Sequence, residues 1–150
     1  MLPMKALRLG LGEALAADTA TLAPAVTPNK IALVIANFSL TENLAIGDLT
    51  YATFAGGSAK AGVAGDQQAG VKPLTGDQAI TILAPAGGWR WECTAAPTPI
   101  QVVYGFALAN DAGDELLAAA LLDTPIAIGD VGDFLDLGSV EITFVIQPMT

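Results

Sequence analysis

The chain has 150 residues, which suits one domain, and only 14% of them are charged although 53% are hydrophobic. Residues 1–90 hold six acidic and six basic side chains, whereas residues 91–150 hold nine acidic and no basic ones, so the net charge of −9 lies entirely in the second segment. Such a surface repels nucleic acid and anionic membranes, because phosphate binding requires clustered Lys and Arg, and we expect neither as a partner.

The scarcity of charge predicts assembly. Ordinary soluble domains are about 25% charged, whereas this chain has 6 basic and 15 acidic side chains to cover its whole surface. Burying part of that surface against copies or partners is the simplest physical remedy. We therefore expect a homo-oligomer.

Residues 1–28 are expected to form an N-terminal helix or arm. Apolar side chains follow one another at close to helical spacing there, and two early glycines place the predicted helix at about residues 13–22. The basic and apolar start also resembles a signal peptide, but an acidic residue and two glycines interrupt its apolar stretch, which favours an ordered helix or arm. The interface residues expected on this arm are Leu7, Leu11 and Leu15.

Residues 29–150 are expected to form a single β-rich domain. The segment 29–40 is apolar on both faces of a strand, which predicts a central strand or one at an interface. Segments 79–85 and 140–146 also predict strands. In segment 87–95 large apolar side chains alternate with polar ones, which is typical of a half-buried strand.

Segment 100–128 decides the fold class. Residues 100–110 alternate like a strand, and 110–114 (NDAGD) favour a tight turn. Residues 115–123 consist of good helix formers, but a helix of nine residues is marginal and sheet pairing overrides local propensity. We therefore predict a strand that pairs antiparallel with 100–109, followed by a separate short strand at 126–128.

These elements predict a mainly β fold, an antiparallel β-sandwich or open barrel of six to eight strands. No long crossover helix that a parallel sheet requires is predicted between the strands.

No common catalytic pattern is present. The chain has no histidine, which removes the Ser-His-Asp and Cys-His arrangements and the common zinc sites. Cys93 is the only cysteine, so an intrachain disulfide is impossible. We expect neither an enzyme nor a cofactor.

Two groups of residues are candidates for binding. Asp130, Asp133 and Asp136 lie near glycines and are a weak candidate for Ca²⁺, although their spacing also suits a solvated loop. Trp89 and Trp91 share one face of a predicted strand. They are expected to be core or interface anchors, and the alternative is a site that stacks on sugar rings.

Three segments together resemble a group of small phage and viral-metagenome proteins: 29–57, 88–94 (GWRWECT) and 102–128. That group has an opening pattern ending in ADFTEATFxGY, a later Y-G-[YF] strand with an acidic turn, and a β-rich C-terminal part. The sequences IGDLTYATFAGG (46–57) and VVYGFALAND (102–111) stand at the corresponding places. The resemblance spans about residues 29–146 and implies virion structural proteins without catalytic residues.

We therefore expect a non-enzymatic structural protein located in the virion: a capsid decoration, head-fibre or tail-associated subunit. Its partners would be copies of itself and other virion proteins. One alternative is a carbohydrate- or cell-surface-binding module that uses Trp89 and Trp91. Another is a self-assembling shell or extracellular protein unrelated to viruses.

Overall fold

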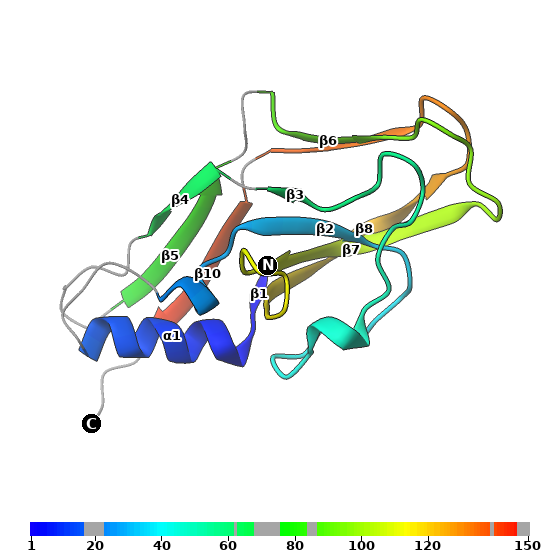
Figure 1. Cartoon of the computed structure of the whole chain (residues 1–150). Coiled ribbons are helices and arrows are strands. Elements are labelled where there is room, and N and C mark those ends of the chain that lie inside the picture. Colours follow the sequence, from blue (N-terminus) through cyan, green and yellow to red (C-terminus); the bar gives the residue numbers. More distant parts are fainter. Residues whose placement is uncertain (17–22, 62, 68–75, 84–86, 139, 147–150) are drawn as a thin grey trace.

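The structure is a computed structural model that describes residues 1–16, 23–61, 63–67, 76–83, 87–138 and 140–146 (Figure 1). The elements in these residues are, in chain order, β1 (Leu2–Pro3), α1 (Lys5–Ala16), the 3-10 helix η1 (Pro24–Val26), β2 (Lys30–Val34), the 3-10 helix η2 (Ile46–Asp48), β3 (Lys60–Ala61), β4 (Val63–Gln67), β5 (Gly76–Leu83), β6 (Trp89–Glu92), β7 (Gln101–Ala109), β8 (Leu116–Ile128), β9 (Phe134–Leu137) and β10 (Val140–Ile146).

The strands form three antiparallel sheets with the orders β1-β8-β7-β2-β3, β10-β5-β4 and β6-β9. The sheets do not close into a barrel, and the prediction of a mainly β, antiparallel sandwich or open barrel is confirmed. Among the described residues, eight strands have four residues or more, which agrees with the predicted six to eight.

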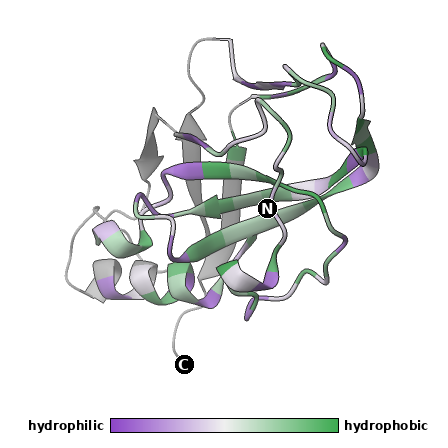
Figure 2. Ribbon diagram, turned by 45° about the vertical axis from the view of Figure 1, so that its right-hand side comes forward, coloured by the Kyte–Doolittle hydropathy of each residue, from purple (hydrophilic) through white to green (hydrophobic). Residues whose placement is uncertain are grey.

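The inner strands β2 and β7 of the five-stranded sheet are buried on both faces. In β2, Ile31 and Leu33 join one buried apolar cluster, whereas Val34 joins a second one. Antiparallel pairing keeps partners on the same face, and Phe106 of β7 lies opposite Leu33 in the first cluster. Figure 2 shows hydrophobic residues along these central strands. The strand predicted within 29–40 is confirmed for Lys30–Val34, which lies between two other strands and is covered on both faces, whereas residues 35–40 are not in a strand.

Different segments cover the two faces. The first cluster includes the inward side chains of the β6–β9 pair, and the rings of Trp91 and Phe106 lie 6.1 Å apart. The second cluster is formed with the segment from Phe38 to Tyr51, which contains η2, together with Met4. The central sheet therefore lies between the β6–β9 pair and an irregular covering segment.

The β7–β8 hairpin confirms the strand predicted at 115–123, which begins at Leu116, but the separate strand at 126–128 is wrong. β8 continues through Pro125 to Ile128. Between the pairs Val103–Ile126 and Gly105–Leu121 the register shifts. Three extra residues of β8 thus form a bulge, and a bulge accommodates a proline that cannot donate a ladder hydrogen bond.

The N-terminal helix begins earlier than predicted. α1 starts at Lys5 and includes both Gly10 and Gly12, whereas the predicted range was 13–22, of which 17–22 lie outside the described residues. Gly10 is required by packing: a Cβ atom there would lie 2.4 Å from Cγ2 of Val26. Close contact with η1 therefore overrides the low helix propensity of glycine.

Candidate functional site

Trp89 and Trp91 lie in the core of the single chain. They are 2% and 0% exposed, and the indole Nε1–H of Trp91 donates to the carbonyl oxygen of Ser58 over 3.0 Å. Both rings point inward because period-two alternation places Arg90 and Glu92 on the outer face of β6. The sugar-stacking and interface interpretations of these tryptophans are therefore wrong, and their other predicted role, as core anchors, is the one observed.

Leu7, the first of the three N-terminal leucines, is buried in the chain's own core. Leu7 is 0% exposed and belongs to the first apolar cluster. Leu11 and Leu15 lie within α1, and their side chains are outside the described part of the structure. β1 pairs with Ala118–Ala119 of β8, which ties this end of the chain to its own sheet. Leu7 is therefore a core residue, and its predicted interface role is wrong.

The three aspartates of the calcium candidate are used separately. The carboxylate of Asp133 accepts hydrogen bonds from the backbone N–H groups of Gly129 and Asp130, each over 2.9 Å. These bonds hold the pKa of Asp133 below its usual value. Asp136 lies on β9 and pairs with Arg90. Within the described ranges no three His, Cys, Asp or Glu side chains could hold a metal ion together.

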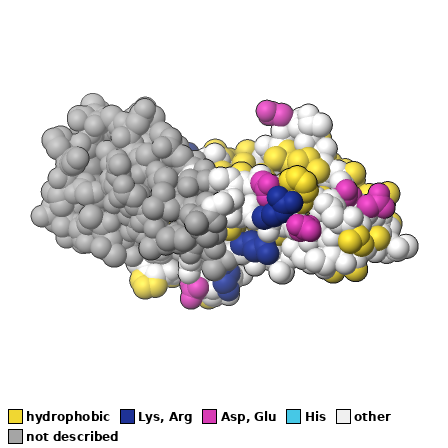
Figure 3. All heavy atoms as spheres, turned by 90° about the horizontal axis from the view of Figure 1, so that it is seen from above, with side chains coloured by type: hydrophobic (Ala, Val, Ile, Leu, Met, Phe, Trp, Pro, Cys, Tyr) yellow, Lys and Arg dark blue, Asp and Glu magenta, His cyan; other side chains and the backbone are white. Residues whose placement is uncertain are grey.

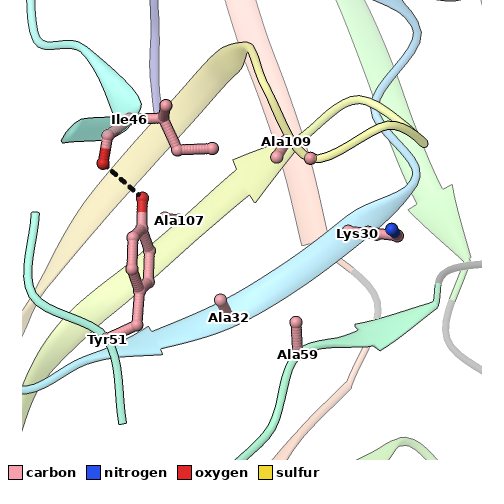
Figure 4. Close-up of a pocket in the computed structure, with 8 residues that line it drawn as sticks. Lys30, Ala32, Ile46, Tyr51, Ala59, Ala107 and Ala109 are labelled. Carbon is pink, nitrogen blue, oxygen red and sulfur yellow. Dashed lines mark hydrogen bonds between the residues drawn. The ribbon is translucent and has the colours of Figure 1, made fainter.

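A pocket of about 170 Å³ opens on the second face of the central sheet, where the covering segment ends (Figure 4). Its floor consists of alanines of β2 and β7, Ala32, Ala107 and Ala109. Tyr51 and Ile46 close one end, and Lys30 lies at the other, where Gly113 is next to its ammonium group. We call this the Lys30 pocket. It lies on the sheet because small side chains at paired strand positions leave space that larger ones would fill.

Lys30 supplies the cation of the pocket lining, and the neighbouring turn carries two acids, Asp111 and Asp114, whose carboxylates accept hydrogen bonds from the side chains of Asn29 and Asn110. The hydroxyl of Tyr51 donates to the carbonyl oxygen of Ile46 over 3.0 Å, and burial raises the pKa of Tyr51 to about 12, so this group stays neutral. Both ion pairs in the described part of the chain use Arg90, and none reaches Lys30. The pocket therefore combines an apolar floor with an ammonium group that has no anionic partner among the described residues.

A second surface lies at the far end of the β7–β8 hairpin. It comprises Ile100 and the turn Gly129–Asp133, and we call it the distal tip. Val131 is 67% exposed at the turn, and Ile100 is 61% exposed. Ile100 packs over Gly129, since a Cβ atom there would lie 3.2 Å from Cγ1 of Ile100. The backbone of Asp133 also donates to the carbonyl oxygen of Asp130 over 3.1 Å, so the turn is ordered by its own hydrogen bonds.

The outer face of the β6–β9 pair continues this apolar and acidic character. Arg90 donates to Glu92 over 3.1 Å and to Asp136 over 2.9 Å, and its guanidinium lies 3.8 Å from the ring centroid of Phe134. These groups are about half exposed, so the ion pairs contribute little to stability. Figure 3 shows hydrophobic side chains next to acidic and basic ones on the described part of this side of the molecule.

Neither the Lys30 pocket nor the distal tip was predicted from the sequence. The pocket joins residues from position 30 to position 113, and no local pattern connects them. The sequence of the tip does indicate an exposed apolar residue. Val131 lies between aspartates and glycines in GDVGD, a turn sequence in which a large apolar side chain is not expected to be buried.

Comparisons with protein-family models, curated proteins and solved structures find no match for this chain. The resemblance to small phage proteins therefore stays a prediction. In the described residues, no helix has the length and apolar character needed to cross a membrane.

Proposed function

We propose that the chain is a non-enzymatic structural subunit of a virus particle that acts through assembly with copies of itself and with other virion proteins. The observation that carries this proposal is the position of the exposed apolar side chains. In the described residues, six large apolar side chains are exposed, and all but Leu9 fall between Ile100 and Phe134. The same half of the chain holds the surplus acids.

The concentration of these side chains supports a protein–protein contact. Single exposed apolar residues are normal on a soluble protein, whereas a group of them rimmed by polar residues marks an interaction surface. Ile126 is paired with Val103 near the start of β7, and Ile100 and Val131 lie at the adjoining distal tip. The resemblance of segments 29–57 and 102–128 to phage proteins supports placing this contact in a virion.

The contact is expected to use side chains and not strand addition. β1 pairs with β8 only at Ala118–Ala119, so the outer edge of β8 beyond Leu121 has no strand neighbour among the described residues. Its bulge and Pro125 disrupt a regular ladder, and the exposed Asp123 adds charge. These are the usual devices that protect a sheet edge from pairing with another chain.

The test is the mass of the full chain in solution. We expect light scattering and native mass spectrometry to show oligomers that grow over about 1–300 µM, a range suited to contacts below the standard interface size. A chain that stays a strict monomer over that range would contradict the proposal. Lysozyme-like or glycan-binding activity without oligomers would favour a different class of protein.

A further inference from the structure

The Lys30 pocket and the distal tip lie at opposite ends of one hairpin. Gly113 of the pocket belongs to the turn that joins β7 to β8, and Lys30 is paired with Ala109 at the same end. Gly129 directly follows the other end of β8. β7 has nine residues, and at 3.3 Å per residue the two surfaces are separated by about 30 Å along the strands. Figure 1 shows the hairpin extending between these ends.

Each surface carries a charged side chain of opposite sign that has no ion-pair partner among the described residues. The pocket presents the ammonium group of Lys30, which has no ion-pair partner within the described ranges. The tip presents the exposed side chain of Asp130 next to Val131. Only the backbone N–H and C=O of Asp130 take part in the turn, so its carboxylate is free to pair with a cation from outside. Opposite charges on two such patches orient the approach of one molecule to another.

The pocket is also large enough for an apolar side chain of the tip. A dry cavity of about 150 Å³ is large enough to hold a benzene ring, and the Lys30 pocket has about 170 Å³. The branched side chain of Val131 is smaller than such a ring. The alanine floor and the ring of Tyr51 supply apolar contacts on several sides. The pocket therefore suits one aliphatic side chain with an acidic neighbour.

The tip is ordered before any contact forms. The Asp133 carboxylate binds two backbone N–H groups of the turn, and the N–H of Gly132 donates to the carbonyl oxygen of Cys93 over 2.9 Å. A rigid element loses little conformational entropy when it docks, which favours association through a small contact.

We propose that copies of this chain associate head to tail, with Val131 and Asp130 of one copy docked at the Lys30 pocket of the next. The inference rests on the proposed structural function and names its partner, a second copy. The contact joins two different surfaces, so each copy in an assembly has one pocket and one tip to offer. Such heterologous contacts build rings or filaments and not a closed two-fold dimer.

The experiment uses two variants of the full chain. Lys30→Glu removes the cation from the pocket, and Val131→Asp removes the apolar side chain from the tip. Each is expected to weaken self-association at least tenfold in sedimentation or light scattering. The matched controls are Arg8→Glu and Leu9→Asp, which make the same chemical changes at exposed positions of α1 and are expected to associate like the wild type.

Mixing the two variants tests the head-to-tail geometry. The Lys30→Glu chain keeps an intact tip and the Val131→Asp chain keeps an intact pocket, so an equimolar mixture is expected to form dimers and nothing larger. A double variant, Lys30→Glu with Asp130→Lys, is expected to recover association because the charges are exchanged. Circular dichroism of each variant checks that its fold is retained.

The outcomes separate this inference from the proposed function. Oligomers of the wild type that persist in both folded variants would overturn the head-to-tail contact and leave assembly standing. A monomeric wild type would overturn both. A variant that fails to fold is replaced by Lys30→Gln or Val131→Ser, for which the same loss is expected.

Discussion

Substituting Gly105 tests how closely strands β7 and β8 approach each other. Gly105 lies in the middle of β7, paired with Val34 of β2 on one side and with Leu121 of β8 on the other. A Cβ atom at Gly105 would lie 2.1 Å from the backbone oxygen of Ala120. The obstacle is backbone and not a flexible side chain, so Gly105→Ala forces the two strands apart.

The magnitude follows from the geometry. Separating the strands enough to bring this contact from 2.1 Å to an acceptable 3.0 Å requires a shift of 0.9 Å. Ladder hydrogen bonds of about 2.9 Å would then lengthen to about 3.8 Å, beyond a useful range. Losing one or two buried hydrogen bonds and straining the packing costs about 3 kcal/mol. For a domain of this size that lowers Tm by about 6–12 °C.

The assay is urea unfolding followed by tryptophan fluorescence. Trp89 and Trp91 are the two tryptophans of the chain and both are buried, so their emission reports loss of the core. The matched control is Gly12→Ala in α1, where nothing lies within 4 Å of the added Cβ atom. That change is expected to stabilise the chain by about 0.5–1 kcal/mol. If Gly105→Ala unfolds within about 0.5 kcal/mol of the wild type, the close approach of β7 and β8 is wrong.

Three further predictions concern polar groups. Asn110 is buried, and its side chain forms hydrogen bonds with the turn after β7 and with the carbonyl oxygen of Ala25. Asn110→Ala is therefore expected to lower the free energy of unfolding in urea by about 2–3 kcal/mol. A change near zero would contradict these hydrogen bonds. The pKa of Asp133 is lowered, so the carboxylate stabilises the turn at pH values above the ordinary 3.8, and this stabilisation is lost as the pH falls through the lower folded pKa. The NMR chemical shift of the Gly129 amide should therefore titrate with a midpoint below 3.8, and a midpoint above 3.8 would refute the hydrogen bonds. The pKa of Tyr51 is raised from 10.0 to about 12, so its contribution to stability is complete below pH 10.0 and is lost as the pH rises through about 12. Phenolate absorbance of a Tyr104→Phe variant, in which Tyr51 is the remaining tyrosine, should show a midpoint at about 12. A midpoint near 10 would contradict the burial of Tyr51.

The Y-G-F sequence in β7 shows how a pattern and a structure explain each other. At the level of sequence, Tyr104, Gly105 and Phe106 belong to a segment that alternates like a strand, and the glycine has no explanation there. In the structure, Gly105 stands at the irregular pairing next to the bulge of β8, where no side chain fits. The glycine is therefore required by the close approach of Ala120, and the adjacent bulge accommodates Pro125.

Residue alternation and turn chemistry were sufficient to predict much of the fold. β2, β6, β7 and β10 follow from apolar periodicity, and the β7–β8 hairpin follows from the turn residues at 110–114 together with the short length of the next segment. Each of these elements is determined mainly by residues close together in the chain, so a local sequence pattern is enough to predict it. The scarcity of charge likewise leads from composition alone to the prediction of assembly.

Tertiary contacts decided the rest. α1 includes Gly10, which packs closely on Val26, and Trp89 and Trp91 are core residues because β6 lies against the central sheet. The Lys30 pocket exists only where alanines of two paired strands meet a covering segment. Propensity and periodicity describe one segment at a time, whereas burial, clefts and close backbone approaches depend on which segments meet in space.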